Sequence, residues 1–438
     1  MKSAFVFQGL NLGVSIGILL IALIFLNTDD YLMWVLFTTI GSGLIHLESA
    51  LNVVSTRTIS RAWLDRSPYL ATVRLVGRGY AQFSSVGSIF MAVSGGLYLT
   101  SIDYGAAKHG WLLPWLGFCL AYFIYYLTSY RSCQLVATGN ITTFTGIGSL
   151  GRLINLAIAA ALAWAGYGLL GLSIAVLASF ALTGLLLELA ARKSIRQMAL
   201  PEAVEPARLT VRMLLRRSAM QAAFAVSSYF LYRGVFLYLS TTMPSAMDAA
   251  SLGLAIQIYG FVVILAAVPL NMRVAPLIAA GRTGNPAAIG AELGHLGKLV
   301  NLAFIVASAG LILVGPEIFK FIPTLAATLP PRSTLAVLAA CFWLEANILI
   351  FVNMWLAIDR FDFVRLYLCG FTIAWLAVAV AIVSGHVYAN TLLLAVLAVQ
   401  SGITAPMIVR RIRRDFGVSL TDYIRAMWHA RLHLSAVH

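Results

Sequence analysis

The feature that most constrains this chain is a series of apolar runs, each about as long as a bilayer is thick. A helix needs about 20 mostly apolar residues to cross the hydrocarbon region, and twelve stretches of the 438-residue sequence provide them. Only 11% of the residues are charged, against roughly 25% in soluble domains, so a soluble globular enzyme is excluded. The sequence predicts an all-α polytopic membrane protein with spans near 4–26, 32–54, 80–100, 112–136, 144–165, 168–190, 214–240, 249–273, 299–315, 333–358, 364–384 and 390–409.

Lysines and arginines are distributed unequally between the connections of these spans. Twenty-five of the 30 fall at the two termini and in alternate connections, and only three fall in the opposite set. Because cytoplasmic loops carry the excess of basic residues, the N and C termini are both expected to be cytoplasmic. The net charge of +14 then reflects topology and attraction to anionic headgroups of membrane lipids, and no nucleic-acid partner is expected.

The longest polar stretch between spans divides the chain into two sets of six. We expect an N-terminal six-helix lobe at 1–200, a cytoplasmic linker at 201–213, a C-terminal six-helix lobe at 214–409 and a cytoplasmic tail at 410–438. The tail includes an amphipathic segment, 418–434, for which two interpretations stay open. It either lies on the inner membrane surface or is a disordered anchor.

The sequence contains no motif for catalysis or for binding a metal. It has no Walker-type phosphate loop, no HExxH and no GxSxG, its histidines do not cluster at metal-ligand spacing, and its cysteines form no CxxC pair. A bundle of spans with short outer connections and no active site is most simply a transporter. We therefore expect a non-enzyme without cofactor or metal; a membrane glycan polymerase or ligase is the less favoured alternative, since its sugar acceptor needs an ordered outer loop.

Ionisable side chains inside the spans are the candidate functional residues, because each costs about 3 kcal/mol or more to insert. Arg152 lies in the fifth expected span and Arg233 in the seventh, while Arg57 and Arg273 mark the inner mouths of the second and eighth spans. Each arginine has an alternative role, either as a side chain that reaches the headgroups or as an ordinary positive-inside residue.

Two acids inside spans, Glu48 in the second and Glu345 in the tenth, are candidates for proton coupling. No cation in its own helix lies near Glu345, so this carboxyl either pairs with an arginine across a cavity or carries a proton. The alternative for both acids is a structural ion pair with Arg152 or Arg233.

A cavity lined by two or three arginines suits an anionic cargo. One cation within about 4 Å of a phosphate contributes about 4 kcal/mol at an effective dielectric constant near 20. Several such cations offset the loss of hydration of a pyrophosphate. A lipid-linked headgroup fits this environment, since its polar part enters the cavity while its tail stays in the bilayer.

Several stretches resemble a known family. The sequence resembles the Wzx-type O-antigen and polysaccharide flippases of the multidrug/oligosaccharidyl-lipid/polysaccharide (MOP) exporter superfamily. The similar stretches are Leu47–Asn52 with Arg57–Ala62; Tyr130–Gln134, Ala137–Gly139 and Ile147–Arg152 with Gly166–Leu172; and Gln257–Pro269 with Pro276. The resemblance extends from residue 1 to about 415. One departure is Asn27-Thr28-Asp29-Asp30, which replaces the family's usual Ala-Arg-x-Leu-Gly after the first span.

The resemblance implies about 12 helices in two lobes that rock around a central cationic cavity. It implies transport of undecaprenyl-pyrophosphate-linked glycan units across the bacterial cytoplasmic (inner) membrane by a monomer, with polysaccharide polymerase and chain-length machinery as partners. Arg57, Arg152, Arg233 and Arg273 would contact the pyrophosphate or acidic sugars, and Glu48 or Glu345 would couple transport to an ion. Alternatives within the superfamily are a cation-coupled drug exporter and a flippase of peptidoglycan lipid precursors.

Overall fold

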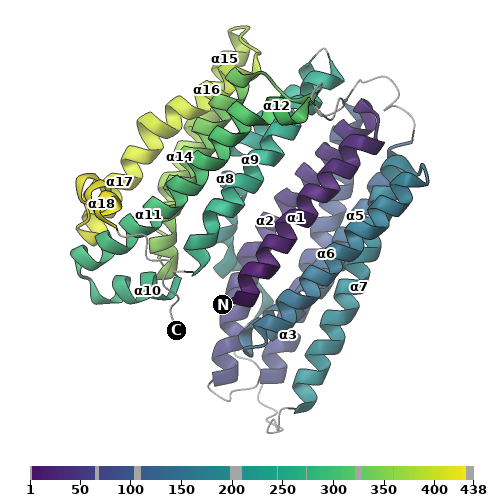
Figure 1. Ribbon diagram of the computed structural model, residues 1–438. Coiled ribbons are helices and arrows are strands. Elements are labelled where there is room, and N and C mark those ends of the chain that lie inside the picture. Colours follow the sequence, from purple (N-terminus) through teal and green to yellow (C-terminus); the bar gives the residue numbers. More distant parts are fainter. Residues whose placement is uncertain are drawn as a thin grey trace. The chain divides into compact units, whose positions relative to one another are not determined.

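The computed structural model describes residues 2–64, 69–102, 110–197, 210–243, 245–272, 274–320, 328–358 and 360–430. Within these residues the chain is built from helices and has no strand, and Figure 1 shows that most of the helices are long rods. Eleven of the described helices are long and apolar enough to cross a membrane. The architecture is therefore that of a multi-pass membrane protein, as the apolar runs predict.

The first of two compact units comprises Met1–Val226 and Ser240–Ala250. In it, α5 packs along α7, α3 and α2, while α6 packs against α7 and α1. A π turn, Met91–Gly95, joins α3 to α4. The helices are α1 (Lys2–Phe25), α2 (Thr28–Leu64), α3 (Tyr69–Phe90), α4 (Gly96–Thr100), α5 (Leu112–Ala137), α6 (Ile141–Trp164) and α7 (Gly168–Gln197).

The second unit comprises Ser227–Leu239 and Ser251–His438, so that α8 (Val211–Thr242) contributes to both units. Here α14 packs against α11 and α16, α15 packs against α16, and α18 packs against α11. Two further π turns follow α11 and α16. The helices are α9 (Ala246–Met272), α10 (Val274–Thr283), α11 (Pro286–Ala309), α12 (Gly315–Phe319), α14 (Arg332–Ala357), α15 (Phe363–Val383), α16 (Ala389–Val399), α17 (Ala405–Phe416) and α18 (Leu420–His429).

An exposed apolar stripe runs along α3 and α4. Val86, Phe90, Val93 and Leu97 recur at helical spacing and are 57–70% exposed. A contiguous apolar row of this length is unfavourable in water, whereas lipid tails are as apolar as these side chains. The stripe therefore indicates the lipid-facing side of this span.

The structure places the expected spans in helices but extends several of them; the helix of the ninth span, expected from 299, begins at Pro286. The first span, 4–26, corresponds to α1. Its apolar segment Gly13–Phe25 is shorter than the eleven helices that are long enough to cross a membrane. The connection expected at 55–79 is largely helical, because α2 continues to Leu64 and α3 begins at Tyr69.

Apolar positions at helical spacing explain this extension. Ile59 on α2, together with Tyr69, Val73 and Val76 on α3, is buried in one core cluster with Cys133 of α5. The arginines of the same segments interrupt the apolar run in the sequence. They do not interrupt the buried face, so average hydropathy predicts a loop where the helices continue.

The predicted linker, 201–213, lies mostly outside the described residues, which omit 198–209. The predicted tail is helical as far as it is described. Gly417, with a φ of 70°, ends α17 in the left-handed conformation that glycine tolerates. A capping box between Ser419 and Asp422 then starts α18. The tail segment is therefore an ordered helix over Leu420–His429, and the disordered interpretation is wrong there.

Helix α18 docks on α11 at two glycines, Gly294 and Gly297. A Cβ atom at Gly294 would lie 2.6 Å from the carbonyl carbon of Ala426 and 2.7 Å from the amide nitrogen of Met427. The Tyr423 hydroxyl of α18 donates to Asn347 Oδ1 of α14 at 3.4 Å, and Lys298 Nζ donates to the Ala430 carbonyl at 2.7 Å. The tail is thus anchored to the second unit by close backbone approach and by hydrogen bonds.

Gly294→Ala is expected to displace α18, because the new methyl group meets backbone atoms that cannot rotate away. Overpacking of this kind costs about 1–3 kcal/mol, so amide protection of residues 420–429 should fall about fivefold or more in hydrogen exchange. Gly290→Ala is the matched control, since its Cβ would meet only Val418 at 3.7 Å. Equal protection of α18 in the two variants would contradict this packing.

Candidate functional site

Arg233 lies on α8 and turns back along its own helix. Its guanidinium carbon lies 4.3 Å from the ring centroid of Tyr229, one turn earlier, and 5.9 Å from the ring centroid of Phe342 on α14. A Cβ atom on Gly260 of α9 would lie 2.9 Å from Arg233 Nη2, so this glycine provides the space for the guanidinium. The cation is therefore held between α8, α9 and α14 of the second unit, against aromatic faces that attract it.

The direction of Arg233 bears on its alternative role as a headgroup anchor. Helical side chains lean towards the N-terminus of their helix, and the distribution of basic residues predicts that the N-terminus of α8 is cytoplasmic. The guanidinium over Tyr229 thus points away from the outer headgroups, which are the nearer ones in the predicted topology. This geometry favours a site within the span.

Glu345 on α14 lies close to Arg233 and is buried, with 7% of its surface exposed. Its Oε1 accepts a hydrogen bond from Ser228 Oγ of α8 at 2.6 Å. Its Oε2 is buried and has no hydrogen-bond partner among the described residues. Arg233 interacts with the carboxyl electrostatically, but no direct ion pair joins them in the described part of this unit. The carboxyl therefore has one oxygen available for a proton or a cation.

Glu48 on α2 has a different environment in the first unit, where it is 3% exposed. Its Oε1 accepts hydrogen bonds from the Tyr80 hydroxyl of α3 at 3.0 Å and from Asn52 Nδ2 at 3.5 Å. The Tyr80 hydroxyl also lies 3.3 Å from Cys133 Sγ of α5. This network joins α2, α3 and α5, whereas the hydrogen bond of Glu345 joins α14 to α8 alone.

Tyr80→Phe is expected to lower the free energy of unfolding by about 1–3 kcal/mol, because the buried Glu48 carboxyl loses its shorter hydrogen bond. The measurement is thermal unfolding of the purified protein in detergent. Tyr31→Phe is the control, since the Tyr31 hydroxyl is buried without a hydrogen-bond partner among the described residues. The network has no structural role if the two variants unfold at the same temperature.

Arg152 and Arg57 lie in the first unit, and both are exposed in the isolated chain. Arg152 on α6 and Glu48 on α2 both lie near Tyr125 of α5. No direct ion pair joins Glu48 to Arg152 among the described residues of this unit. Arg57 on α2 lies one turn from Arg61, and the two positive charges repel each other.

The glycines near Arg152 do not form one packed face. Gly151 approaches α7, where its carbonyl accepts from Ser179 Oγ at 2.8 Å, whereas Gly146 and Gly148 face open space. Arg273, the fourth arginine of the expected site, lies outside the described residues. The structure thus brings together Glu48 with Arg152 around Tyr125, and Glu345 with Arg233.

Comparison with known proteins informs the fold. Neither a protein-family model nor a curated protein sequence matches the chain. The inward-facing structure of a multidrug resistance MATE family transporter of the MOP superfamily matches with a TM-score of 0.74 at 14% identity, over 92% of this chain and 94% of that chain. The chain has the MOP-transporter fold.

Two further solved structures share the fold at the same identity of 14%. The lipid II flippase MurJ, in an inward closed conformation, matches with a TM-score of 0.63 over 97% of this chain and 90% of that chain. A MOP superfamily transporter from Pyrococcus furiosus, described by the reverse polarity of its binding pocket, matches with a TM-score of 0.64 over 94% of each chain. The predicted likeness to the superfamily is therefore confirmed for the fold.

Sequence reasoning missed the partners of the ionisable residues. Tyr229 and Arg233 are four residues apart and share a helix face, so their contact has a signal in the sequence. Ser228 and Glu345 lie 117 positions apart, and nothing local connects them. The sequence identifies the ionisable residues that are costly to insert into a membrane. Only the packing of α8 against α14 shows which side chains surround Glu345 and Arg233.

Proposed function

We propose that the chain is a flippase, not an enzyme, that moves undecaprenyl-pyrophosphate-linked oligosaccharide units of O-antigen, capsule or exopolysaccharide across the bacterial inner membrane by alternating access. The observation that carries this proposal is the position of Arg233. An intramembrane guanidinium is held over Tyr229 and Phe342, and no carboxylate of the described residues pairs with it directly. Such a cation favours an anionic cargo, and a pyrophosphate is one that lipid-linked glycans carry.

The comparisons support the proposal through the kinds of cargo that their names state. MurJ is a lipid II flippase, so a protein with this fold acts on a lipid-linked molecule. For the Pyrococcus furiosus transporter, reverse polarity of the pocket is taken to suggest a different function. Pocket polarity is therefore a sensible basis for separating cargo classes within the fold, and here the arginines point to an anion.

In this proposal Arg57, Arg152, Arg233 and Arg273 contact the pyrophosphate or acidic sugars. Of the two acids, Glu345 is the better coupling group, because its carboxyl accepts a single hydrogen bond and lies near Arg233, whereas Glu48 accepts from both Tyr80 and Asn52. A membrane potential would bias such a cycle by about 2.3 kcal/mol per charge per 100 mV. A monomer acting beside polysaccharide polymerase and chain-length machinery completes the proposed role.

A cation-coupled drug exporter is the second candidate, and one observation favours it. The buried Glu345 with its unpartnered oxygen is a group that attracts a cationic compound once it is ionised. A multidrug resistance transporter has the same fold, which is consistent with this alternative. A flippase of peptidoglycan lipid precursors is an alternative with the same fold, since MurJ is a lipid II flippase.

Ligand-induced stabilisation distinguishes these cargo classes. A compound that binds only the folded state at 100 times its dissociation constant stabilises it by about 2.7 kcal/mol. We expect a short-chain polyprenyl-pyrophosphate oligosaccharide to raise the melting temperature of the purified protein more than its monophosphate analogue. A cationic drug should have no effect, and Arg233→Ala should remove the shift. Stabilisation by the drug and not by the pyrophosphate would overturn the proposed cargo.

A further inference from the structure

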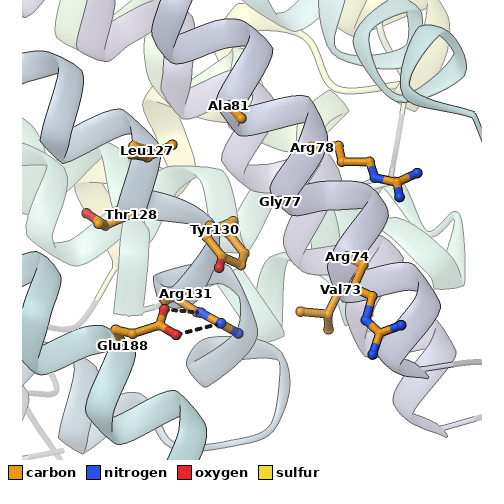
Figure 2. Close-up of a pocket in the computed structure, with 10 residues that line it drawn as sticks. All are labelled: Val73, Arg74, Gly77, Arg78, Ala81, Leu127, Thr128, Tyr130, Arg131 and Glu188. Carbon is orange, nitrogen blue, oxygen red and sulfur yellow. Dashed lines mark hydrogen bonds and ion pairs between the residues drawn. The ribbon is translucent and has the colours of Figure 1, made fainter.

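The first unit contains a second cationic feature, a pocket between α3, α5 and α7. It encloses about 560 Å³, within the range of small-molecule sites. Figure 2 shows Arg131 turned towards Glu188 inside the pocket, while Arg74 and Arg78 follow each other along α3. Its lining includes Arg74, Arg78 and Ala81 of α3, Leu127 and Arg131 of α5, and Glu188 of α7.

The one acid among the described residues that line the pocket is fully paired. Arg131 Nε and Nη2 donate to Glu188 Oε2 and Oε1 at 2.6 and 2.8 Å, and Nη1 donates to Gln134 Oε1 at 2.8 Å. The same guanidinium lies 4.5 Å from the ring centroid of Tyr130. Arg131 and Glu188 therefore form a fixed, bidentate pair. Arg192 Nε also donates to Glu188 Oε1 at 2.7 Å, so this acid is neutralised by the protein's own arginines and does not oppose an anion.

The rim of the pocket is cationic. Arg74 and Arg78 are exposed one turn apart on α3, and neither forms an ion pair or a hydrogen bond with the described residues. Like charges at this spacing repel each other. The rim therefore carries two positive charges without a counterion in the described part of the chain, beside a cavity large enough for a ligand.

The polarity of the pocket changes along the helices that line it. On α3 the arginines precede Ala81, which lies towards the interior of the expected span, and on α5 Leu127 lies one turn before Arg131, also towards the interior. The distribution of basic residues places the arginine end at the cytoplasmic interface. Charge at the interface and apolar lining at greater depth match the arrangement of a phospholipid, with its headgroup at the surface and its chains below.

We infer that this pocket binds an anionic phospholipid of the cytoplasmic leaflet. The phosphate lies at Arg74 and Arg78, and the start of an acyl chain lies along Leu127 and Ala81. Glu188, paired with Arg131 and Arg192, lies at the floor, where its negative charge is neutralised. The site is independent of the proposed cargo, because none of the residues proposed to contact the pyrophosphate or to couple transport lines it.

Native mass spectrometry of the full chain, purified in detergent and given back phosphatidylglycerol or phosphatidylcholine, tests the inference. The wild-type protein is expected to retain phosphatidylglycerol in preference to phosphatidylcholine. In the double variant Arg74→Gln and Arg78→Gln, retention should fall about fivefold for each arginine removed. Arg212→Gln with Arg216→Gln is the matched control, since these arginines are also exposed four residues apart on a helix of the same unit. The control should retain phosphatidylglycerol as wild type does.

Two further arms distinguish a lipid from other anions. Ala81→Leu fills the apolar part without changing charge, and it should lower retention if a chain lies there. Glycerophosphoglycerol, the headgroup without chains, should compete poorly. The inference is overturned if the two arginine pairs have equal effects, which indicates general attraction to a basic surface. It is also overturned if Ala81→Leu has no effect or if the chain-free headgroup competes as well as the lipid.

Discussion

Arg233→Ala is expected to lower transport of the pyrophosphate-linked glycan by up to about a thousandfold. One cation within about 4 Å of a phosphate contributes about 4 kcal/mol at an effective dielectric constant near 20, and 1.4 kcal/mol corresponds to a factor of ten. The measurement is the rate at which a fluorescent lipid-linked oligosaccharide crosses the membrane of proteoliposomes. Arg233→Lys should be intermediate, because lysine keeps the charge but loses the planar stacking on Tyr229.

Removing Arg233 also takes a positive charge from beside the buried Glu345, so loss of folding is a competing explanation. The double variant Arg233→Ala with Glu345→Gln removes both charged groups. It should insert and remain monodisperse, and it should still fail to transport. Transport at the wild-type rate by inserted Arg233→Ala would show that this arginine only anchors the helix.

Glu345→Gln should make transport independent of an imposed proton gradient. Glutamine keeps an oxygen that accepts from Ser228 and removes the group that exchanges a proton. The free energy of unfolding should change by no more than about 2 kcal/mol, since one unpartnered polar atom replaces another. If Glu345 carries one charge through the cycle, the variant loses a bias of about 2.3 kcal/mol per 100 mV, which is about fiftyfold.

The measurement for Glu345 compares transport with and without the gradient in wild type and variant proteoliposomes. Glu317→Gln is the control, because Glu317 is an exposed acid that pairs with Lys320. It should respond to the gradient as wild type does. Glu48→Gln should lose stability in addition, since Glu48 joins three helices. If the Glu345→Gln variant still responds to the gradient, a residue other than Glu345 couples transport to protons.

The helical architecture follows from the sequence because crossing a bilayer imposes a length and a polarity that any span must meet. The same rule fails where helices leave the membrane. The extensions at 55–64 and 69–79 carry arginines on one face and a buried row on the other, so average hydropathy marks them as loops. Their period of apolar residues, and not their composition, predicts the helices that the structure contains.

The candidate site is only partly visible in the sequence. Insertion cost identifies Arg152, Arg233, Glu48 and Glu345 as unusual, but it does not say what surrounds them. Tyr80 lies 32 residues from Glu48 and Ser228 lies still further from Glu345. Such pairs are set by the packing of helices that are distant in the chain, so the different environments of the two acids require the structure.

The most direct test of the central claim is transport by the wild-type chain. Reconstituted alone into proteoliposomes, it should move a fluorescent undecaprenyl-pyrophosphate oligosaccharide between leaflets faster than protein-free vesicles, while a cationic drug is not transported. The glycan lipid must become accessible to an external reagent that modifies its sugar. If that lipid stays in its original leaflet while the drug is transported, the proposal that the cargo is a pyrophosphate-linked glycan is contradicted, and only the assignment of the fold still holds.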